Sequence, residues 1–409
     1  MAARPGRGPH ARARPRPAPP ARRPLRDRHH RRPRAARPRR DPRRRARCHR
    51  SSRTARGLPR GPPAPPRPRR PGSRRRRPRH RPAPRGAPVT DIPTTHRRAT
   101  AVLDEVDTVV VGKRAATEVV LAAVLAGGHV LMEDYPGLGK TLAARTFATT
   151  LGLDFTRAQF TPDLLPSDLT GSFVYDQGRG GFEFRHGPVF TGLLLADEIN
   201  RTPPKTQAAL LEAMQEHQVT VEGQTFPLPR PFHVLATANP VEYEGTYPLP
   251  EAQLDRFLVR VAFGYPDADE EWQVLSRRME RRQEDQQARQ VVDPAQLLEM
   301  QGALEDVTVA PEVGRYCVAL ARATRGHEHV LMGSSPRGSL ALLLVGRALA
   351  VVRGRDYLAP DDVKTVAPAV LEHRVVVRPE LWMTEVTSGS VVADVLRTVP
   401  APRVTVQER

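Results

Sequence analysis

A glycine-rich turn ends in Gly139-Lys140-Thr141, with Gly137 two positions earlier. In a phosphate-binding loop (P-loop), backbone N–H groups and a helix N-terminus bind phosphates, the lysine reaches the terminal phosphates and the hydroxyl binds Mg²⁺. The consensus places its first glycine where this chain has Asp134. The turn nevertheless follows an apolar run and precedes a helical one, which is the context that the motif requires. We therefore predict a phosphate site, with a chance surface turn as the alternative.

Two adjacent carboxylates, Asp197 and Glu198, end the apolar run Leu193–Ala196. Phosphoryl transfer depends mainly on positioning and charge stabilisation. We predict that Asp197 binds Mg²⁺ and that Glu198 orients the attacking water. The alternative is an ordinary strand end at a solvated edge, but the phosphate turn upstream favours the functional interpretation.

A third apolar run, Val234–Ala238, is followed by Asn239 and a proline. The short amide of Asn239 could hydrogen-bond the attacking water or the γ-phosphate. The alternative is a turn signal, because Asn-Pro favours turns.

Two arginines could stabilise the charge that develops during phosphoryl transfer. Arg256 lies in Leu254–Phe257 and Arg337 in Ser335–Gly338. A guanidinium supplied by a neighbouring subunit or a closing domain can raise the rate by roughly 10³ or more. An isolated arginine is more often a surface charge or part of a weak ion pair, and this remains the alternative for each.

Short β-like runs and helical periodicity alternate through the segment that carries these residues. The β-like runs cover 129–132, 153–160, 193–197, 233–238 and 258–263, and helices are expected over Ala99–Ala126, Thr141–Leu151 and Pro204–Glu216. Strands that alternate with helices predict a parallel α/β sheet covered by helices on both faces.

Helix signals replace the β-like runs from about residue 267 to about residue 377. Gln273–Gln290 is highly charged, Ser339–Val352 is strongly apolar, and Pro360-Asp361-Asp362 has the composition of a helix start. We therefore expect an α/β domain over 91–266, a smaller all-helical domain over 267–380 and a C-terminal tail over 381–409.

The first 90 residues differ from the rest in composition. They contain 33 Arg, 21 Pro and two acids, for a net charge of +31, which leaves −10 for residues 91–409 of a chain at +21. Such a segment cannot bury enough apolar surface to fold, so we predict disorder. It could bind nucleic acid or anionic lipid electrostatically, but we favour a segment without function, from GC-rich coding or a start codon assigned too early.

Targeting and redox signals are weak. We find no secretory signal, and the longest apolar stretches, Val119–Met132 and Leu340–Val352, fall short of the ~20 residues that a bilayer requires. Two cysteines make a disulfide framework improbable and favour a cytoplasmic protein.

Taken together, these residues resemble the MoxR family of AAA+ ATPases, in the same broad clade as the magnesium chelatase ATPase subunit. The resemblance extends from about Arg97 to Val377. The family commonly has Asp or Gly at the position of Asp134, so the mismatch there no longer weakens the P-loop assignment. The resemblance rests on Val111-Gly112, Glu133–Thr141, Gln159–Asp168, Ala196–Arg201, Gln207–Glu216, Ala236–Pro240, Leu249–Phe257 and Ser335–Arg337.

The resemblance implies a P-loop AAA+ fold, with a parallel five-stranded sheet between helices and a small helical lid domain, and ATP and Mg²⁺ as cofactors. It implies hairpin insertions at Gly171–Pro188 and Val219–Pro231. Lys113 departs from the family, where Gln is common. The implied ATP contacts are Val111, Gly112, Pro136, Gly137, Leu138, Gly139, Lys140, Thr141, Leu142 and Asp197; Mg²⁺ would be bound by Thr141 and Asp197. The implied catalytic residues are Glu198, Asn239 (sensor 1), Arg337 (sensor 2) and Arg256 (arginine finger), with Arg201 as the alternative finger.

Such ATPases form rings, usually hexamers, in which a neighbour's arginine completes each site. The resemblance implies a homo-hexamer that remodels a client protein, with a co-partner bearing a von Willebrand factor A domain. One alternative is a nucleic-acid motor that uses the basic tail, although residues 91–409 offer no obvious basic stripe. A second alternative is a scaffold that binds nucleotide without hydrolysing it.

Overall fold

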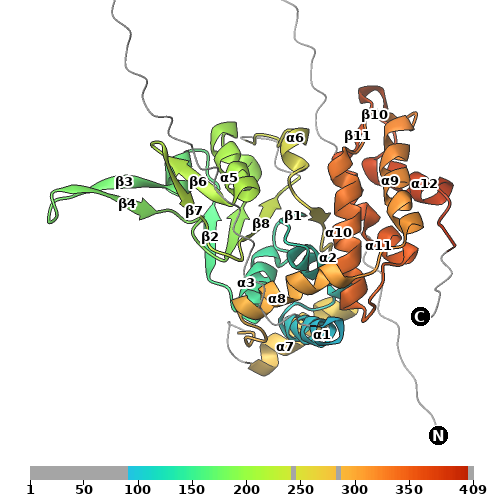
Figure 1. The fold of residues 1–409 in the computed structure, drawn as a ribbon, viewed down its shortest axis with the longest axis horizontal. Coiled ribbons are helices and arrows are strands. Elements are labelled where there is room, and N and C mark those ends of the chain that lie inside the picture. Colours follow the sequence, from blue (N-terminus) through green and yellow to red (C-terminus); the bar gives the residue numbers. More distant parts are fainter. Residues whose placement is uncertain (1–90, 241–245, 282–286, 404–409) are drawn as a thin grey trace, which may run out of the picture. The chain divides into compact units, whose positions relative to one another are not determined.

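The computed structural model describes residues 91–240, 246–281 and 287–403. Residues 1–90 lie outside the described residues, so the predicted disorder of that segment remains a prediction. Figure 1 shows the described elements in chain order.

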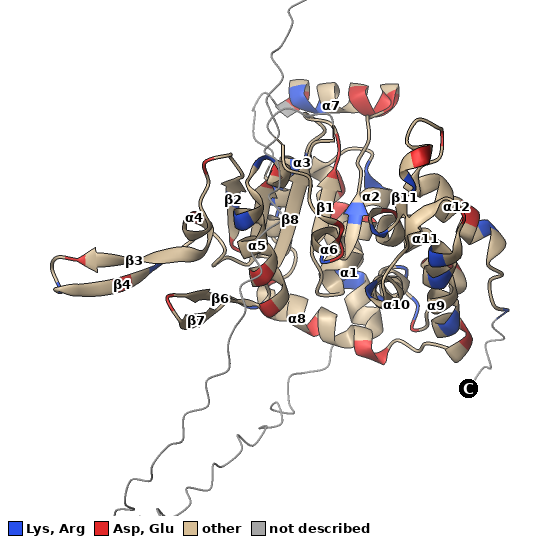
Figure 2. Cartoon of the chain, turned by 90° about the horizontal axis from the view of Figure 1, so that it is seen from above, with Lys and Arg blue, Asp and Glu red and all other residues tan. Residues whose placement is uncertain are grey.

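A five-stranded parallel sheet forms the centre of the α/β region, in the order β2-β5-β8-β1-β9. Parallel strands covered on both faces are apolar along their whole length. The sequence follows this rule: β8 carries no charged residue (Figure 2) and is buried throughout. The strands are β1 (Val130–Glu133), β2 (Phe155–Gln159), β5 (Leu193–Asp197), β8 (His233–Ala238) and β9 (Val259–Val261).

Alternate residues of β1, β5 and β8 belong to two separate apolar clusters, one on each face of the sheet. Leu193 and Leu195 pack with α1 (Ile92–Val109), α2 (Arg114–Leu125) and α3 (Lys140–Thr150). On the other face, Leu194 and Ala196 pack with α5 (Pro204–Glu216). The predicted sheet between helices is therefore confirmed.

The single helix predicted over Ala99–Ala126 is wrong, because the chain turns between α1 and α2. Gly112 lies in this turn with φ +71°, a conformation that side chains with a Cβ rarely adopt. Helical periodicity continued on both sides of the turn and concealed it.

Two hairpins occupy the predicted insertions. The first pairs β3 (Gly171–Asp176) with β4 (Gly181–His186) after the short helix α4 (Pro166–Thr170). The second pairs β6 (Gln218–Val221) with β7 (Gln224–Pro227). Figure 1 shows that the first hairpin extends away from the sheet, and Phe182 on it is 73% exposed.

The C-terminal region is mainly helical, and four of its helices have proline in the first turn, where a missing N–H costs nothing. Its elements are α7 (Ala268–Arg281), α8 (Pro294–Ala303), α9 (Pro311–Gly326), β10 (Val330–Met332), α10 (Pro336–Val352), α11 (Pro360–Leu371), the 3₁₀ turn η3 (Glu372–Arg374), β11 (Val376–Val377) and α12 (Ser388–Thr398).

Two details of the predicted helical domain need correction. Strands β10 and β11 form a small antiparallel ribbon, so the domain is not all-helical. The segment 381–409 was expected to be a tail, but α12 lies within it and buries Val391, Val392 and Val395 in the core. Within the described part of the chain, every helix is too short or too polar to cross a bilayer.

Candidate nucleotide and arginine sites

The predicted phosphate turn joins β1 to α3. Gly137 has φ +83° and Gly139 has φ +78°, and a Cβ added to either would meet no atom within 4 Å. Backbone geometry explains both glycines, and the open space above them leaves room for a ligand. Gly139 is the N-cap residue of α3, so the first free N–H groups of this helix lie in the turn.

The amine of Lys140 faces the same space. It donates to the backbone carbonyl oxygens of Asp134 and, at 3.4 Å, of Ala238. Burial lowers the pKa of Lys140, and the surrounding carboxylates oppose this shift. A cation bonded to neutral carbonyl groups can accept an anion without first losing a carboxylate partner.

The hydrogen bonds of Asp134 explain why this chain has Asp where the P-loop consensus has Gly. Its Oδ2 accepts hydrogen bonds from the N–H groups of Phe263 and Gly264, both at 2.7 Å, and its Oδ1 accepts from Tyr135 N–H at 2.9 Å. The carboxylate therefore connects the start of the phosphate turn to the chain that leaves β9.

The two predicted acids lie at the end of β5 beside Thr237 of β8. The Thr237 hydroxyl donates to Asp197 Oδ1 at 2.6 Å and accepts from the Glu198 N–H at 2.8 Å. Glu198 has φ +57°, which is uncommon for a residue with a side chain. Thr237 thus fixes the positions of both acids.

Strand β2, at the edge of the sheet, supplies partners to each acid. Arg157 donates to Asp197 Oδ2 from Nε at 2.9 Å and from Nη2 at 2.6 Å. Gln159 Nε2 donates to Glu198 Oε2 at 2.6 Å. Arg201, the alternative finger, contacts the same Glu198 oxygen at 3.0 Å and is therefore engaged within its own chain.

One pocket of about 360 Å³ brings most of the predicted nucleotide site together. A hydroxyl and a carboxylate oxygen suit Mg²⁺, so Thr141 and Asp197 fit the predicted ion. Among the described residues no group of three or more His, Cys, Asp or Glu could bind a metal by itself, so further ligands would be phosphate oxygens and water. The pocket is lined by Pro136, Gly137, Leu138, Gly139, Lys140, Thr141, Leu142, Asp197, Glu198, Thr237, Ala238 and Asn239.

Val111 and Gly112 do not line this pocket. A Cβ at Gly112 would lie 2.1 Å from the Glu270 carboxyl group, so α7 covers this residue closely. The neighbouring Lys113 amine bonds to Glu270 at 3.2 Å and to the Tyr265 carbonyl at 3.1 Å. Their contact with adenine therefore stays a prediction.

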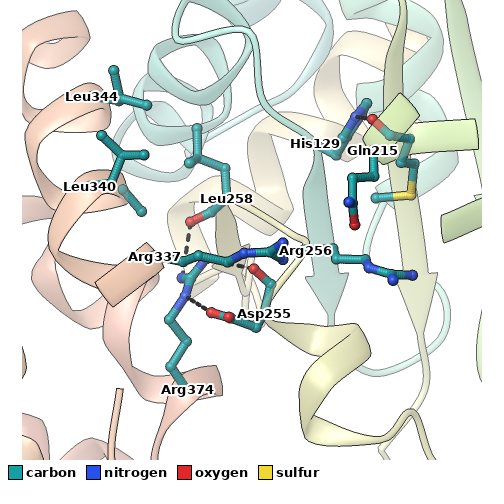
Figure 3. Close-up of a pocket in the computed structure, with 11 residues that line it drawn as sticks. His129, Gln215, Asp255, Arg256, Leu258, Arg337, Leu340, Leu344 and Arg374 are labelled. Carbon is teal, nitrogen blue, oxygen red and sulfur yellow. Dashed lines mark hydrogen bonds and ion pairs between the residues drawn. The ribbon is translucent and has the colours of Figure 1, made fainter. Parts of the chain in front are cut away.

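Arg256 and Arg337 lie together in a second pocket, of about 230 Å³, and none of the described residues lines both pockets. Figure 3 shows Arg337 on the side of Leu340 of α10, whereas the Arg256 side chain extends away from α10, toward the side of Gln215. Neither guanidinium forms a hydrogen bond or an ion pair with any described residue. Within one chain, the structure therefore does not unite the arginines with the acids.

Comparison with known proteins assigns the chain that carries these pockets to a protein family. Residues 129–259 match the ATPase family associated with various cellular activities (AAA), and residues 322–395 match the AAA lid domain. The chaperone MoxR1 of Mycobacterium tuberculosis is 43% identical over 338 residues, which cover 80% of this chain and 88% of that protein. The chain belongs to the MoxR family of AAA ATPases.

Two further similar proteins support this family assignment. Protein YeaC of Bacillus subtilis is 46% identical to this MoxR-family chain over 73% of the chain and 93% of YeaC. A crystal structure of a protein from Cytophaga hutchinsonii, assigned as an ATPase, has 42% sequence identity and a TM-score of 0.70, covering 76% of this chain and 96% of that one. The similarity covers the sheet and the helical domain, so the predicted AAA fold followed by a lid domain is confirmed.

Sequence analysis missed three side chains that position the acids of this MoxR-family site. Thr237 is the polar member of the otherwise apolar run Val234–Ala238, and Arg157 and Gln159 alternate along β2. Register would have revealed them, since Gln159 pairs with Asp197 and strands β5 and β8 are adjacent. That register was not evident from the sequence.

Proposed function

We propose that this chain is a Mg²⁺-dependent ATPase that works as a ring, with a chaperone-like role in maturing or assembling client proteins. The observation that carries the proposal is the division of the site into two pockets. Lys140, Asp197, Glu198 and Asn239 line one pocket, whereas Arg256 and Arg337, whose guanidinium groups bond to none of the described residues, line another.

Each residue of the phosphate pocket has a role that its position supports. The turn and Lys140 would bind the phosphates, and Thr141 and Asp197 would hold Mg²⁺, which neutralises phosphate charge when bound. Glu198 would orient and polarise the attacking water, and Asn239 would hydrogen-bond that water or the γ-phosphate. Gln159 and Arg201 already restrict the Glu198 carboxylate, so little reorganisation would precede the reaction.

The arginine pocket would act on the nucleotide of the next subunit. Two guanidinium groups with no carboxylate partner in the part of the chain that the structure describes favour an anion, and a terminal phosphate of a neighbouring copy supplies one. A head-to-tail interface of this kind generates a closed ring when its rotation closes. A homo-hexamer is the ring size we propose.

The proposals of a client protein and of a cytoplasmic location rest on one relative and on composition. One relative is named a chaperone, which supports a client protein, and we propose a co-partner with a von Willebrand factor A domain. The exposed Tyr175 and Phe182 of the first hairpin offer apolar contact to a client. The two-cysteine composition supports the cytoplasm. The alternative of a nucleic-acid motor gains no support from the relatives.

The test compares two substitutions in the full-length chain. Lys140→Ala should abolish binding of a fluorescent ATP analogue, because the phosphates lose their cation. Glu198→Gln should bind the analogue like the unmodified protein but reduce phosphate release by about 10² or more. Normal turnover by the Glu198 variant would refute the mechanism, and tight binding by the Lys140 variant would refute the site.

A further inference from the structure

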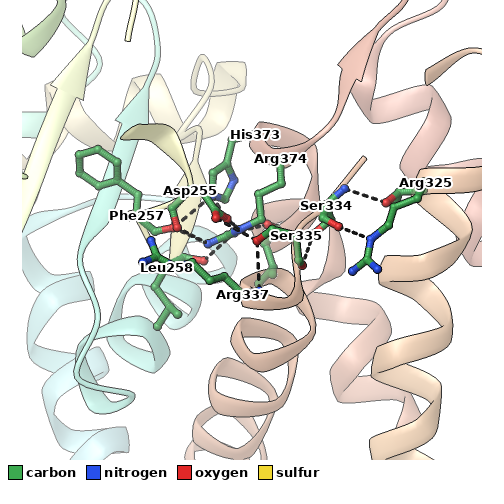
Figure 4. A network of polar contacts seen from close by, with 11 residues as sticks. Asp255, Phe257, Leu258, Arg325, Ser334, Ser335, Arg337, His373 and Arg374 are labelled. Carbon is green, nitrogen blue, oxygen red and sulfur yellow. Dashed lines mark hydrogen bonds and ion pairs between the residues drawn. The ribbon is translucent and has the colours of Figure 1, made fainter. Parts of the chain in front are cut away.

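A third arginine, Arg374, also lines the arginine pocket, but its guanidinium is bonded within the chain. Arg374 lies in η3 of the lid domain, and its side chain is only 3% exposed. Its guanidinium contacts five oxygen atoms: Asp255 Oδ1 at 2.8 Å, Phe257 O at 2.6 Å, Leu258 O at 3.2 Å, Asp255 O at 3.4 Å and Val370 O. Four of these five oxygens belong to the segment that contains Arg256 (Figure 4).

The five N–H groups of an arginine are thus matched by five acceptors. Burial lowers the pKa of Arg374, and Asp255 opposes that shift. A buried guanidinium without these acceptors would be strongly unfavourable. The lid domain and the Arg256 segment are therefore restrained at one point.

Asp255, the ion-pair partner of Arg374, is also connected to Arg337 through the hydroxyl of Ser335. Asp255 Oδ2 accepts from the Ser335 hydroxyl at 2.9 Å, and the Ser335 hydroxyl oxygen accepts from the Arg337 N–H at 3.1 Å. Ser335 is the N-cap residue of α10, so this hydroxyl fixes the first turn of the helix that carries Arg337.

At Gly338, in the same first turn of α10, the backbone lies close to the side chains of Ser334 and Arg374. A Cβ there would lie 1.9 Å from Ser334 Oγ and 3.3 Å from Arg374 Cδ. On the far side, Arg325 Nε donates to the Ser334 carbonyl at 2.6 Å. The start of α10 is consequently held on both sides while the guanidinium of Arg337 remains exposed in the pocket.

We infer that Arg374 is a positioning residue that aligns Arg256 and Arg337, through Asp255 and Ser335, as one paired anion-binding unit for the nucleotide of a neighbouring copy. This inference rests on the proposed function. Arg374 would contact no nucleotide, in its own chain or in the next. Its loss should therefore affect a neighbour's turnover and leave nucleotide binding in its own chain intact.

The experiment is a mixing assay with full-length chains. Arg374→Lys keeps the charge but cannot match five acceptors in a planar arrangement. Alone, it should bind the fluorescent ATP analogue within about twofold of the unmodified protein and hydrolyse ATP at least about tenfold more slowly. The unmodified rate would overturn the inference, and so would lost nucleotide binding.

Mixing then separates the two sides of the interface. A Lys140→Ala chain has intact arginines but no phosphate site, so it can complete the site of an Arg374→Lys neighbour. In a 1:1 random mixture about one quarter of the interfaces are productive. The rate should thus recover to about a quarter of that of the unmodified protein, instead of the roughly one-twentieth expected from simple dilution.

Arg256→Ala mixed with Lys140→Ala is the reference. If this pair fails to recover, the proposed action between subunits is wrong, whatever Arg374 does. If this pair recovers and the Arg374→Lys pair does not, the inference about Arg374 is wrong and the proposed function stands.

Ser335→Ala provides the second test and decides the matter if Arg374→Lys does not fold. It removes the hydroxyl between Asp255 and Arg337 while leaving the buried guanidinium paired. We expect a loss of about threefold to tenfold in turnover, unchanged nucleotide binding and recovery on mixing with Lys140→Ala. An unmodified rate, or a loss that mixing does not repair, would overturn the inference.

Discussion

The phosphate pocket and the arginine pocket differ in how their charged groups are satisfied. Asp197 and Glu198 each have side-chain partners on strands of the sheet, and Arg201, in the turn after β5, adds a further partner to Glu198. Arg256 and Arg337 have none among the described residues, although their backbone segments are tightly bonded. The first pocket is organised as a site in which one chain suffices for binding, whereas the second is organised to receive something from outside the chain.

The strongest challenge to this contrast is Arg256→Ala. Because Arg256 does not line the phosphate pocket, the variant should keep nucleotide affinity within about threefold while turnover falls by roughly 10³. Binding titrations and steady-state phosphate release measure the two effects. Arg322→Ala, at an exposed position of α9, is the matched control and should change neither quantity.

A parallel loss of nucleotide affinity in Arg256→Ala would mean that both pockets serve the same bound nucleotide. The two-pocket description would then fail. Arg337→Ala tests the same point independently, because Arg337 lies on the lid domain rather than in the α/β domain.

Thr237→Val should have a smaller effect, confined to the phosphate pocket. Valine has nearly the same shape but can neither donate to Asp197 nor accept from the Glu198 N–H. We expect turnover to fall by about 10 to 100-fold and stability by about 1–3 kcal/mol, since a buried N–H loses its acceptor. Steady-state kinetics and denaturant unfolding measure these changes. Thr237→Ser retains the hydroxyl and should stay close to the unmodified protein; equal losses in both variants would exclude a hydrogen-bonding role.

The sheet and the acids were predictable from the sequence because both depend on local pattern. The expected ranges of β5, β8 and α5 agree with the structure, since buried parallel strands are continuously apolar and a proline starts the helix. The carboxyl ends of adjacent parallel strands meet at one edge of a sheet, so Asp197 and Asn239 had to lie near the phosphate turn.

The polar contacts that organise the two pockets were not predictable. Arg374 bonds to Asp255, 119 positions earlier in the chain, and Asp134 bonds to Phe263, 129 positions later. No local periodicity records such pairs. The turn at Gly112 and the helix α12 were missed for a different reason, because their signals are local: helical periodicity continues on both sides of Gly112, and α12 begins at the Thr387–Ser390 capping box.

Two buried histidines near the arginine pocket make the stability of the folded chain depend on pH. His129 lines the arginine pocket and His233 lies near His129, at the start of β8. The described residues that line the phosphate pocket include no histidine. Burial lowers the pKa of His129 to about 3 and that of His233 to about 4. The N–H of Val234 donates to His129 Nδ1 at 3.0 Å, so His129 is neutral in the folded chain.

The sign of the pH effect follows from these lowered pKa values. Below pH 6.5 the unfolded chain gains protons that the folded chain excludes, so the stability that both histidines contribute is complete above pH 6.5 and declines as pH falls toward 4. Each should lower the unfolding free energy by about 1.4 kcal/mol per pH unit in this window. In denaturant unfolding, the stability difference between His233→Gln and the unmodified protein should change little between pH 7.5 and 6.5, and should shift by about 1 kcal/mol in favour of the variant between pH 6.5 and 5.5. A constant difference for His233→Gln over the three pH values would show that His233 is not held neutral in the folded chain.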